Sequence, residues 1–218
     1  MYENRDITTL DIEVAYATLT VKRGKKLAVE TNNSNIDCNN DNQKLQIKEK
    51  KHNWFLNNEN QDVIVYLPED TELEKVKINS GAGKIIIENL VTENLTFELG
   101  AGEAEIQNIK VLSNAEIEGG AGKLTVETGT INNLDLDMGV GEVKIKAKLT
   151  GRNEINAGIG NLRLDIQGEK EEYSIKIDKG VGSIKLDGGE AINGEKYGNG
   201  ENSIEIDGGI GKIDVEFI

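Results

Sequence analysis

The feature that most constrains this chain is a Gly-x-Gly motif, which occurs seven times between short segments of alternating apolar and polar residues. The motif glycines are Gly81/Gly83, Gly100/Gly102, Gly120/Gly122, Gly139/Gly141, Gly158/Gly160, Gly180/Gly182 and Gly209/Gly211. Successive first glycines are 19, 20, 19, 19, 22 and 29 residues apart. A repeat of this length is typical of solenoid proteins, in which each repeat buries its apolar face only by stacking on its neighbours.

Four columns of apolar residues appear when the repeats are aligned on their first glycine. They lie five and three positions before it and four and six positions after it. Three columns are entirely apolar, and the column five positions before the glycine is interrupted only by Asn153. Because alternate residues of a strand face the same side, the columns predict the buried faces of two strands that flank each glycine pair.

The pattern predicts an all-β, single-domain parallel β-helix with about 19–20 residues per coil and a Gly-x-Gly corner in each coil. Equivalent strands would lie in parallel register about 4.8 Å apart. A right-handed coil is favoured because parallel crossover connections are nearly always right-handed. The residue between the two glycines is Ala, Val or Ile in every repeat, and we expect it to point into the corner.

The chain divides into two regions by this pattern. Residues 1–75 have the strand pattern without glycine pairs, and we interpret them as irregular N-terminal coils or a cap of the solenoid. An independent N-terminal sandwich is the alternative. Residues 76–218 form the regular repeats, with a polar loop inserted at residues 188–202. The last strand, at residues 215–218, would leave an unpaired edge, which predicts an end-to-end homodimer.

The formal net charge of −14 excludes several classes of partner. Nonspecific nucleic-acid binding depends on Lys and Arg that neutralise phosphates, so no nucleic-acid partner is expected. An anionic membrane surface would repel the chain for the same reason. No apolar run approaches the roughly 18 residues of a membrane span, so the chain itself is expected to be soluble. Cys38 is the only cysteine, which excludes an internal disulfide.

Ligand motifs built on glycine do not fit the repeats. The dinucleotide fingerprint needs a third glycine and a following helix, but that position holds residues such as Glu105, Lys144 and Arg163. The calcium-binding β-roll needs an Asp two residues after Gly-Gly-x-Gly, where this chain has Leu124 and Ile213. The glycines therefore predict corners, and no cofactor.

Residues for catalysis are few. His52 is the only histidine and lies in a polar segment beside Trp54, with no Gly-x-Ser-x-Gly motif elsewhere. We therefore predict no enzyme, no catalytic triad and no His/Cys metal site. A carbohydrate-active β-helix enzyme stays open as an alternative. It would need two carboxylates about 5–9 Å apart in a cleft lined by aromatic residues, for which Trp54 and Tyr197 are the candidates.

An acidic patch is the most informative outward feature. If the repeats stack in register, two neighbouring columns bring together Glu98, Glu116, Glu118, Asp135, Asp137 and Glu154. Three positions after the first glycine the charge alternates instead, through Lys84, Glu103, Lys123 and Glu142. Like charges that face each other across a ladder are destabilising. The six carboxylates are candidates for a weak Ca²⁺ site or a surface for a cationic partner, and a solvated acidic face is the alternative.

One stretch of the chain resembles a known family. The strand at residues 63–70, which contains Tyr66-Leu67-Pro68, precedes the strand at residues 73–78 and the Gly-Ala-Gly coils. This arrangement resembles the bacterial putative-adhesin family of β-strand-repeat proteins, over residues 10–218. The resemblance implies a β-solenoid on the extracytoplasmic side of bacterial cells, often behind a membrane anchor. It implies no catalytic residues and no assigned function.

The sequence thus predicts a non-enzymatic cell-surface or envelope-associated β-solenoid that binds a protein or polysaccharide surface. Stacked repeats suit this role because they create extended binding surfaces. Two alternatives stay open: the carbohydrate-active enzyme, and a scaffold partner of a membrane protein.

Overall fold

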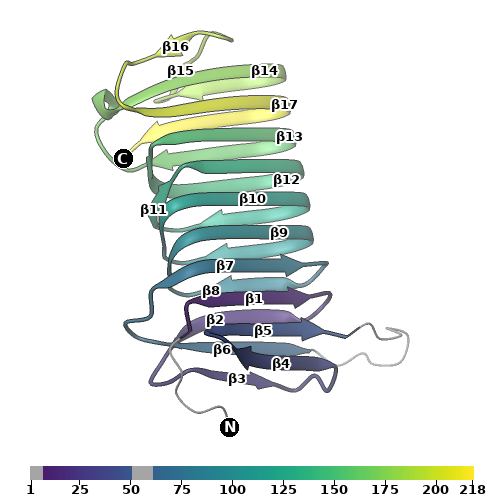
Figure 1. The fold of residues 1–218 in the computed structure, drawn as a ribbon. Coiled ribbons are helices and arrows are strands. Elements are labelled where there is room, and N and C mark those ends of the chain that lie inside the picture. Colours follow the sequence, from purple (N-terminus) through teal and green to yellow (C-terminus); the bar gives the residue numbers. More distant parts are fainter. Residues whose placement is uncertain (1–6, 51–60) are drawn as a thin grey trace.

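The computed structural model describes residues 7–50 and 61–218, and it is an all-β stack of mostly parallel strands (Figure 1). His52 and Trp54 lie outside the described residues. The N-terminal strands are short: β1 (Thr9–Val14), β2 (Thr18–Gly24), β3 (Ala28–Thr31), β4 (Ile36–Asp41), β5 (Lys44–Glu49), β6 (Asp62–Pro68), β7 (Leu73–Ser80) and β8 (Lys84–Ile87). The long strands are β9 (Leu90–Ile106), β10 (Ile109–Val126), β12 (Leu134–Thr150), β13 (Arg152–Ile166), β14 (Tyr173–Leu186) and β17 (Asn202–Phe217). The remaining elements are β11 (Gly129–Asn132), β15 (Gly189–Glu190), β16 (Lys196–Tyr197) and a 3₁₀ turn, η2 (Lys170–Glu172).

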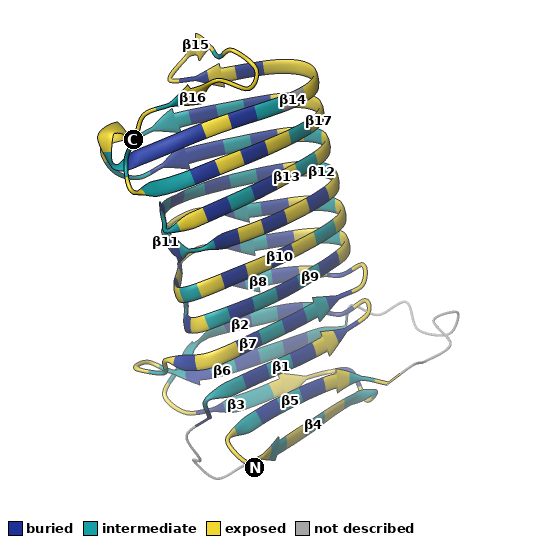
Figure 2. Ribbon diagram, turned by 45° about the horizontal axis from the view of Figure 1, so that its top comes forward, coloured by how far each residue is buried: buried dark blue, intermediate teal, exposed yellow. Residues whose placement is uncertain are grey.

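Each long strand bends at its Gly-x-Gly motif into a first arm before the glycines and a second arm after them. In the first arm of β10, Ile117 pairs in parallel with Phe97 on one side and Leu136 on the other. In its second arm, Leu124 pairs with Ala104 and Val143. Residues of the predicted apolar columns are buried in both arms, and Figure 2 shows buried and exposed positions alternating along the strands. The core therefore lies between the arms.

The structure corrects the expectation that each Gly-x-Gly corner separates two strands. Only the first motif does so, because Gly81 and Gly83 lie between β7 and β8. In the six later motifs one strand runs through the corner and includes both glycines, because residues without a Cβ let a paired backbone bend. The second glycines of these motifs pair with one another from coil to coil, in the order Gly102, Gly122, Gly141, Gly160, Gly211 and Gly182.

Asn153 interrupts the apolar columns, and its side chain is fully buried. Its Oδ1 accepts a hydrogen bond of 3.1 Å from the backbone N–H of Leu134, on β12. Its Nδ2 donates a hydrogen bond of 3.0 Å to the backbone oxygen of Ser203, on β17. Because buried polar groups are tolerated when they are hydrogen-bonded, Asn153 holds three successive coils together instead of weakening the core.

The corner glycines permit a close approach between coils. The N–H of Ala101 donates a 2.6 Å hydrogen bond to the carbonyl of Gly81 in the adjacent coil. A Cβ placed on Gly160, where φ is +145°, would clash with the carbonyl oxygen of Gly141. A Cβ would meet a carbonyl oxygen of an adjacent coil in the same way at the other second glycines: Gly83, Gly102, Gly122, Gly141, Gly182 and Gly211. A side chain at these positions would therefore push neighbouring coils apart.

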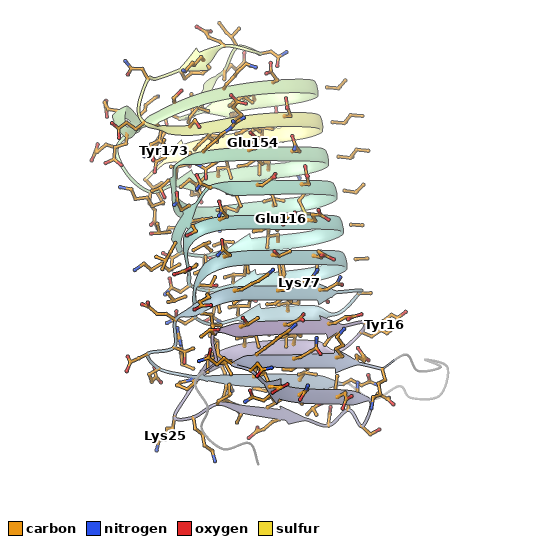
Figure 3. All side chains as sticks on the ribbon, in the orientation of Figure 1. Tyr16, Lys25, Lys77, Glu116, Glu154 and Tyr173 are labelled. Carbon is orange, nitrogen blue, oxygen red and sulfur yellow. The ribbon has the colours of Figure 1, made fainter. Side chains whose placement is uncertain are left out.

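The prediction that the middle residue of Gly-x-Gly points into the corner is wrong. Val140, Ile159 and Val181 are 50%, 52% and 69% exposed. Before the first glycine, the inward residues lie at odd distances: three and five positions away, and one position away at Ser80, Leu99 and Met138. After it, they lie at even distances, four and six positions away. The bend thus shifts the alternation by one residue, and the middle residue lies on the outside of the turn. Figure 3 shows side chains projecting away from the stack along this corner.

The coils do not stack in the order of the sequence. The last strand, β17, lies between β13 and β14, because Ile206 pairs with Ile155 on one side and Ile177 on the other (Figure 1). The expected open edge at residues 215–218 is therefore wrong: Val215 pairs with both Leu164 and Leu186. The outer edge of β14 is bordered by the antiparallel strands β15 and β16. The end-to-end homodimer loses this physical reason and stays a prediction.

The N-terminal strands belong to the same stack. β1 pairs in parallel with β7 and β5, and β2 pairs with β8 and β6. Val14 pairs with Ser80 and Leu19 with Ile85, so residues 15–17 form a corner beside residues 81–83. Tyr16 occupies the outward middle position of that corner and is 63% exposed. The right-handed sense of the coil, its length of about 19–20 residues and the division at residue 75 stay predictions.

Candidate functional site

The structure brings the six predicted carboxylates together on the outward side of the first arms. Glu118 pairs with Glu98 and Asp137, and Asp135 pairs with Glu116 and Glu154. Figure 3 shows Glu116 and Glu154 on the same side of the stack, with Lys77 further along it. Two further carboxylates join them, since Glu205 pairs with Glu154, and Asp207 pairs with Asn156, which pairs with Asp137. Asp178 follows Asp207 at the end of the column and forms an ion pair with Lys176 of its own strand. We call this surface the acidic face: Glu98, Glu116, Glu118, Asp135, Asp137, Glu154, Glu205 and Asp207.

Sequence reasoning missed Glu205 and Asp207 because it assumed that coils stack in chain order. In that order, Lys176 would face Glu154 and interrupt the acidic column. Because β17 lies between β13 and β14, Glu205 stands beside Glu154, and Lys176 stands on the other side of Glu205. Four carboxylates, Glu116, Asp135, Glu154 and Glu205, therefore follow one another in this column with no cation between them.

Positive and amide groups border the acidic face at several points. Lys77 Nζ lies 3.0 Å from Glu98 Oε1, and Arg152 Nη2 lies 2.5 Å from Glu154 Oε1. Asn156 Nδ2 donates a 2.6 Å hydrogen bond to Asp137 Oδ1. The sequence did not reveal these partners, which come from different columns or coils. Within the described part of the chain, the central residues Glu116, Glu118 and Asp135 make no ion pair.

The like charges around Asp135 help to raise the pKa of its carboxyl group. Partial burial raises the pKa of this carboxyl above its ordinary value, and the neighbouring charges of Asp137, Glu154 and Glu116 raise it further. Both effects disfavour the ionised carboxylate. The centre of the acidic face is thus a region of negative potential that a cation would relieve.

An open groove runs along the corner beside the acidic face. Its wall consists of Asn79, Glu98, Glu118, Asp137, Asn156 and Asp207, and its floor includes Gly81, Gly100, Gly120, Gly139, Gly158 and Gly209. We call it the corner groove. Six coils contribute to it, so it extends about 24 Å at 4.8 Å per coil. Among the described residues that line it, none is aromatic and none is basic. Its shape and charge suit an extended, positively charged ligand.

The predicted corner glycines differ in their relation to this groove. Six of the seven first glycines line its floor, whereas the described lining includes neither Gly180 nor any second glycine: Gly83, Gly102, Gly122, Gly141, Gly160, Gly182 and Gly211. The second glycines lie beyond the outward middle residue, against the backbone of an adjacent coil. The first glycines also lie close to an adjacent coil, since a Cβ on Gly139 or Gly158 would meet a carbonyl oxygen there. Both glycines of a motif therefore let coils approach closely, and the first glycines in addition border the corner groove.

The geometry gives no compact metal or catalytic centre among residues 7–50 and 61–218. No group of three or more His, Cys, Asp or Glu side chains in these ranges is arranged to hold a metal ion. The acidic face is a ladder with one or two carboxylates per coil, whereas Ca²⁺ takes six to eight oxygen ligands. The weak Ca²⁺ site at Glu98, Glu116, Glu118, Asp135, Asp137 and Glu154 stays a prediction.

Tyr197 and Cys38 lie away from the groove lining. The hydroxyl of Tyr197 accepts a 2.7 Å hydrogen bond from the N–H of Ile192, within the loop that borders β14. Cys38 is half-buried on β4, and burial followed by the charge of Asp37 raises the pKa of its thiol. A raised pKa reduces the thiolate fraction, so Cys38 is a poor nucleophile.

On the outward side of the second arms, basic side chains form ion pairs with the neighbouring carboxylates, unlike at the centre of the acidic face. Arg163 Nη2 lies 2.7 Å from Glu216 Oε2 and 2.9 Å from Asp165 Oδ1, and Arg163 Nη1 lies 3.4 Å from Asp214 Oδ2. Lys84 Nζ lies 3.8 Å from Glu103 Oε2 in the neighbouring coil. We call this surface the paired face: Lys84, Glu103, Glu105, Lys123, Glu142, Arg163, Asp165, Asp214 and Glu216.

The chain matches one family model and is similar to two solved structures. The family model described as Toastrack DUF4097 matches residues 7–198. The chain is similar in structure to a putative cell adhesion protein from Clostridium sporogenes, with 19% identity, a TM-score of 0.43, and coverage of 98% of this chain and 93% of that one. It is also similar to a putative adhesin from Bacteroides fragilis, with 12% identity, a TM-score of 0.46, and coverage of 98% and 94%. No curated protein matches the chain.

The described residues include no helix with the length and apolar character needed to cross a membrane.

Proposed function

The chain belongs to the Toastrack DUF4097 family, and we propose that it is a non-enzymatic, adhesin-like binding protein of the bacterial cell surface or envelope. The corner groove and the acidic face would hold an extended protein or polysaccharide surface. One observation carries the proposal: Glu116, Glu118 and Asp135 stand in register beside an open groove, and none of them forms an ion pair with another described residue. Since uncompensated charge lowers stability, its presence here is best explained by a partner.

Binding suits the acidic face better than catalysis. A glycoside hydrolase needs one carboxyl group protonated as an acid and a second one ionised, at a single cleavage point. Here equivalent carboxylates recur along several coils, and no aromatic residue lines the described groove to stack on a sugar ring. A repeated surface distributes contacts along an extended partner, as solenoids generally do.

The surface location is part of the proposal, and the family resemblance supports it. It can be tested on intact bacteria that express the gene in its natural context. A membrane-impermeant amine reagent should label the lysines of the protein before the cells are lysed. Labelling only after lysis would contradict a location outside the cytoplasm.

Retention on isolated bacterial envelopes tests the binding role. The acidic-face variant Glu116→Gln/Glu118→Gln/Asp135→Asn removes three charges, and the paired-face variant Glu103→Gln/Glu105→Gln/Glu142→Gln is its control. We expect retention of the acidic-face variant to fall about tenfold, which corresponds to about 1.4 kcal/mol, and that of the control to change little. Equal retention of both variants, or release of products from a polysaccharide panel, would contradict the proposal.

A further inference from the structure

Four aliphatic side chains stand exposed in an unbroken row along the corner. Val140, Ile159, Ile210 and Val181 are 50%, 52%, 55% and 69% exposed. Val140 pairs with Ile159, Ile159 pairs with Ile210, and Ile210 pairs with Val181. We call these four residues the corner ridge. Three coil intervals give it a length of about 14 Å.

The fold does not require these aliphatic residues. Ala82, Ala101 and Ala121 occupy the same outward position in earlier coils. The corner thus forms equally well with a methyl group. Branched side chains favour strands, but contiguous exposed apolar surface also promotes association. The enlargement from Ala to Val and Ile in four adjacent coils therefore indicates a surface that is covered by a partner.

The corner ridge borders the corner groove. Three residues before Val140, Ile159 and Ile210 in the chain stand Asp137, Asn156 and Asp207, which form part of the groove wall. Three residues along a strand span at most about 10 Å. A segment that lies on the corner would therefore contact aliphatic groups on one side and carboxylates on the other.

We propose that the corner ridge and corner groove dock a cationic amphipathic polypeptide segment. Its apolar side chains cover Val140, Ile159, Ile210 and Val181, and its Lys or Arg side chains lie over Asp137 and Asp207. This inference rests on the proposed binding function and names the class of partner.

Charge complementarity favours this occupant over two others. A second copy of the chain carries the same net charge of −14 and would bring a second acidic face toward the first. An anionic membrane would likewise meet the carboxylates beside the ridge. A segment with positive charge relieves the repulsion and covers the apolar atoms at the same time.

The test uses three synthetic twelve-residue peptides with alternating Lys–Leu, Lys–Ser or Glu–Leu sequences. The ridge variant is Val140→Ala/Ile159→Ala/Val181→Ala/Ile210→Ala, which reproduces the alanines of the earlier corners. The control variant Leu112→Ala/Ile192→Ala/Ile218→Ala removes exposed aliphatic groups elsewhere, at positions that are 40%, 66% and 54% exposed. Thermal melts check that each variant is folded, and Ile159→Ala/Ile210→Ala serves as a milder ridge variant.

We expect the wild type to bind the Lys–Leu peptide at least about tenfold more tightly than the Lys–Ser peptide. The ridge variant should lose this preference, and the control variant should keep it. An unchanged preference in the ridge variant, or equally tight binding of the Glu–Leu peptide, would overturn the inference. So would ridge-dependent self-association in sedimentation, or ridge-dependent binding to phosphatidylcholine vesicles. If the acidic-face variant binds the Lys–Ser peptide as tightly as the wild type does, the proposed function is also contradicted. If the acidic-face variant binds more weakly but the ridge variant binds like the wild type, only the inference about the corner ridge is contradicted.

Discussion

The acidic face and the paired face are built by the same strands, on either side of the same corner, yet they distribute charge in opposite ways. On the paired face, Arg163 contacts carboxylates of its own strand and of β17. On the acidic face, Glu116, Asp135 and Glu154 follow one another in register. The shared backbone shows that parallel stacking does not itself dictate charge pairing. The paired face therefore contributes to the stability of the stack, whereas the acidic face is the surface that we propose to bind a partner.

We expect the largest loss of stability when a substitution disturbs the corner that joins the two faces. Gly160→Val would place a side chain against the backbone of Gly141 at a φ of +145°. We expect a loss of about 3 kcal/mol or more in the free energy of unfolding, measured by urea denaturation. Gly189→Ala is the control, because its Cβ would meet only the oxygen of Leu186, at 3.6 Å. Similar losses in both variants would show that close coil contact at the corner is unimportant.

Arg163 on the paired face and Arg152 beside the acidic face allow the stability contributions of their ion pairs to be compared. Arg163→Met would leave Asp165, whose side chain is 11% exposed, without its cation. Asp214, whose side chain is 13% exposed, would keep only Lys212 as an ion-pair partner. We expect a loss of about 2 kcal/mol, because a buried carboxylate without a partner is costly. Arg152→Met breaks the ion pair with Glu154, whose side chain is 44% exposed, and should cost about 0.5 kcal/mol or less. Equal effects on the melting temperature would remove the distinction between the faces.

The apolar columns could be predicted from the sequence because alternation and a constant period determine which side chains face inward. The order of the coils could not. β14 and β17 present the same apolar residues, such as Ile177 and Ile206, so either order buries the same side chains. The outward charges could have indicated the order of the coils. In the structure Asp214 lies opposite Arg163, whereas stacking in chain order would place Lys185 opposite Arg163.

The N-terminal corner was also beyond the sequence pattern, because residues 15–17 contain no glycine. The hydrogen bonds of its backbone N–H groups explain why this corner forms without glycine. Those of Ala15 and Tyr16 donate to the carboxylate of Glu49, at 2.6 and 3.2 Å, instead of to the backbone of another coil. A side-chain acceptor leaves room for a Cβ, so glycine is not required. This arrangement has no regular spacing that a repeat alignment could detect.

Asp135 gives a smaller test, which depends on pH. Its pKa is raised in the folded protein above the ordinary value of 3.8, so its ionised form destabilises the native state. This penalty is present at neutral pH and disappears as the pH falls through the raised pKa. Asp135→Asn should therefore raise the melting temperature at pH 7 by about 1 °C, since solvent screening limits the effect. The difference should shrink as the pH falls through the raised pKa and vanish below the ordinary value of 3.8.

Asp214→Asn on the paired face is the opposite control. It removes a carboxylate that contacts Arg163 and Lys212, both at 3.4 Å, and should lower the melting temperature. Stabilisation by both substitutions would mean that net charge, and not the arrangement of each face, determines stability.

The smallest expected effect concerns calcium. If Glu118 and Asp137 belong to a weak site, millimolar Ca²⁺ should stabilise the wild type by about 1 kcal/mol or less. Glu118→Gln/Asp137→Asn should abolish that shift in a thermal melt. The absence of any shift in the wild type would remove the metal interpretation of the acidic face.

The central claim is that the acidic face, and not merely the overall negative charge, binds a cationic partner. Titration calorimetry with the Lys–Ser peptide at low ionic strength tests it most directly, because the acidic-face and paired-face variants each remove three carboxylates. We expect the affinity to fall about tenfold in the acidic-face variant and less than about twofold in the paired-face variant. Equal losses of affinity in the two variants would contradict the account.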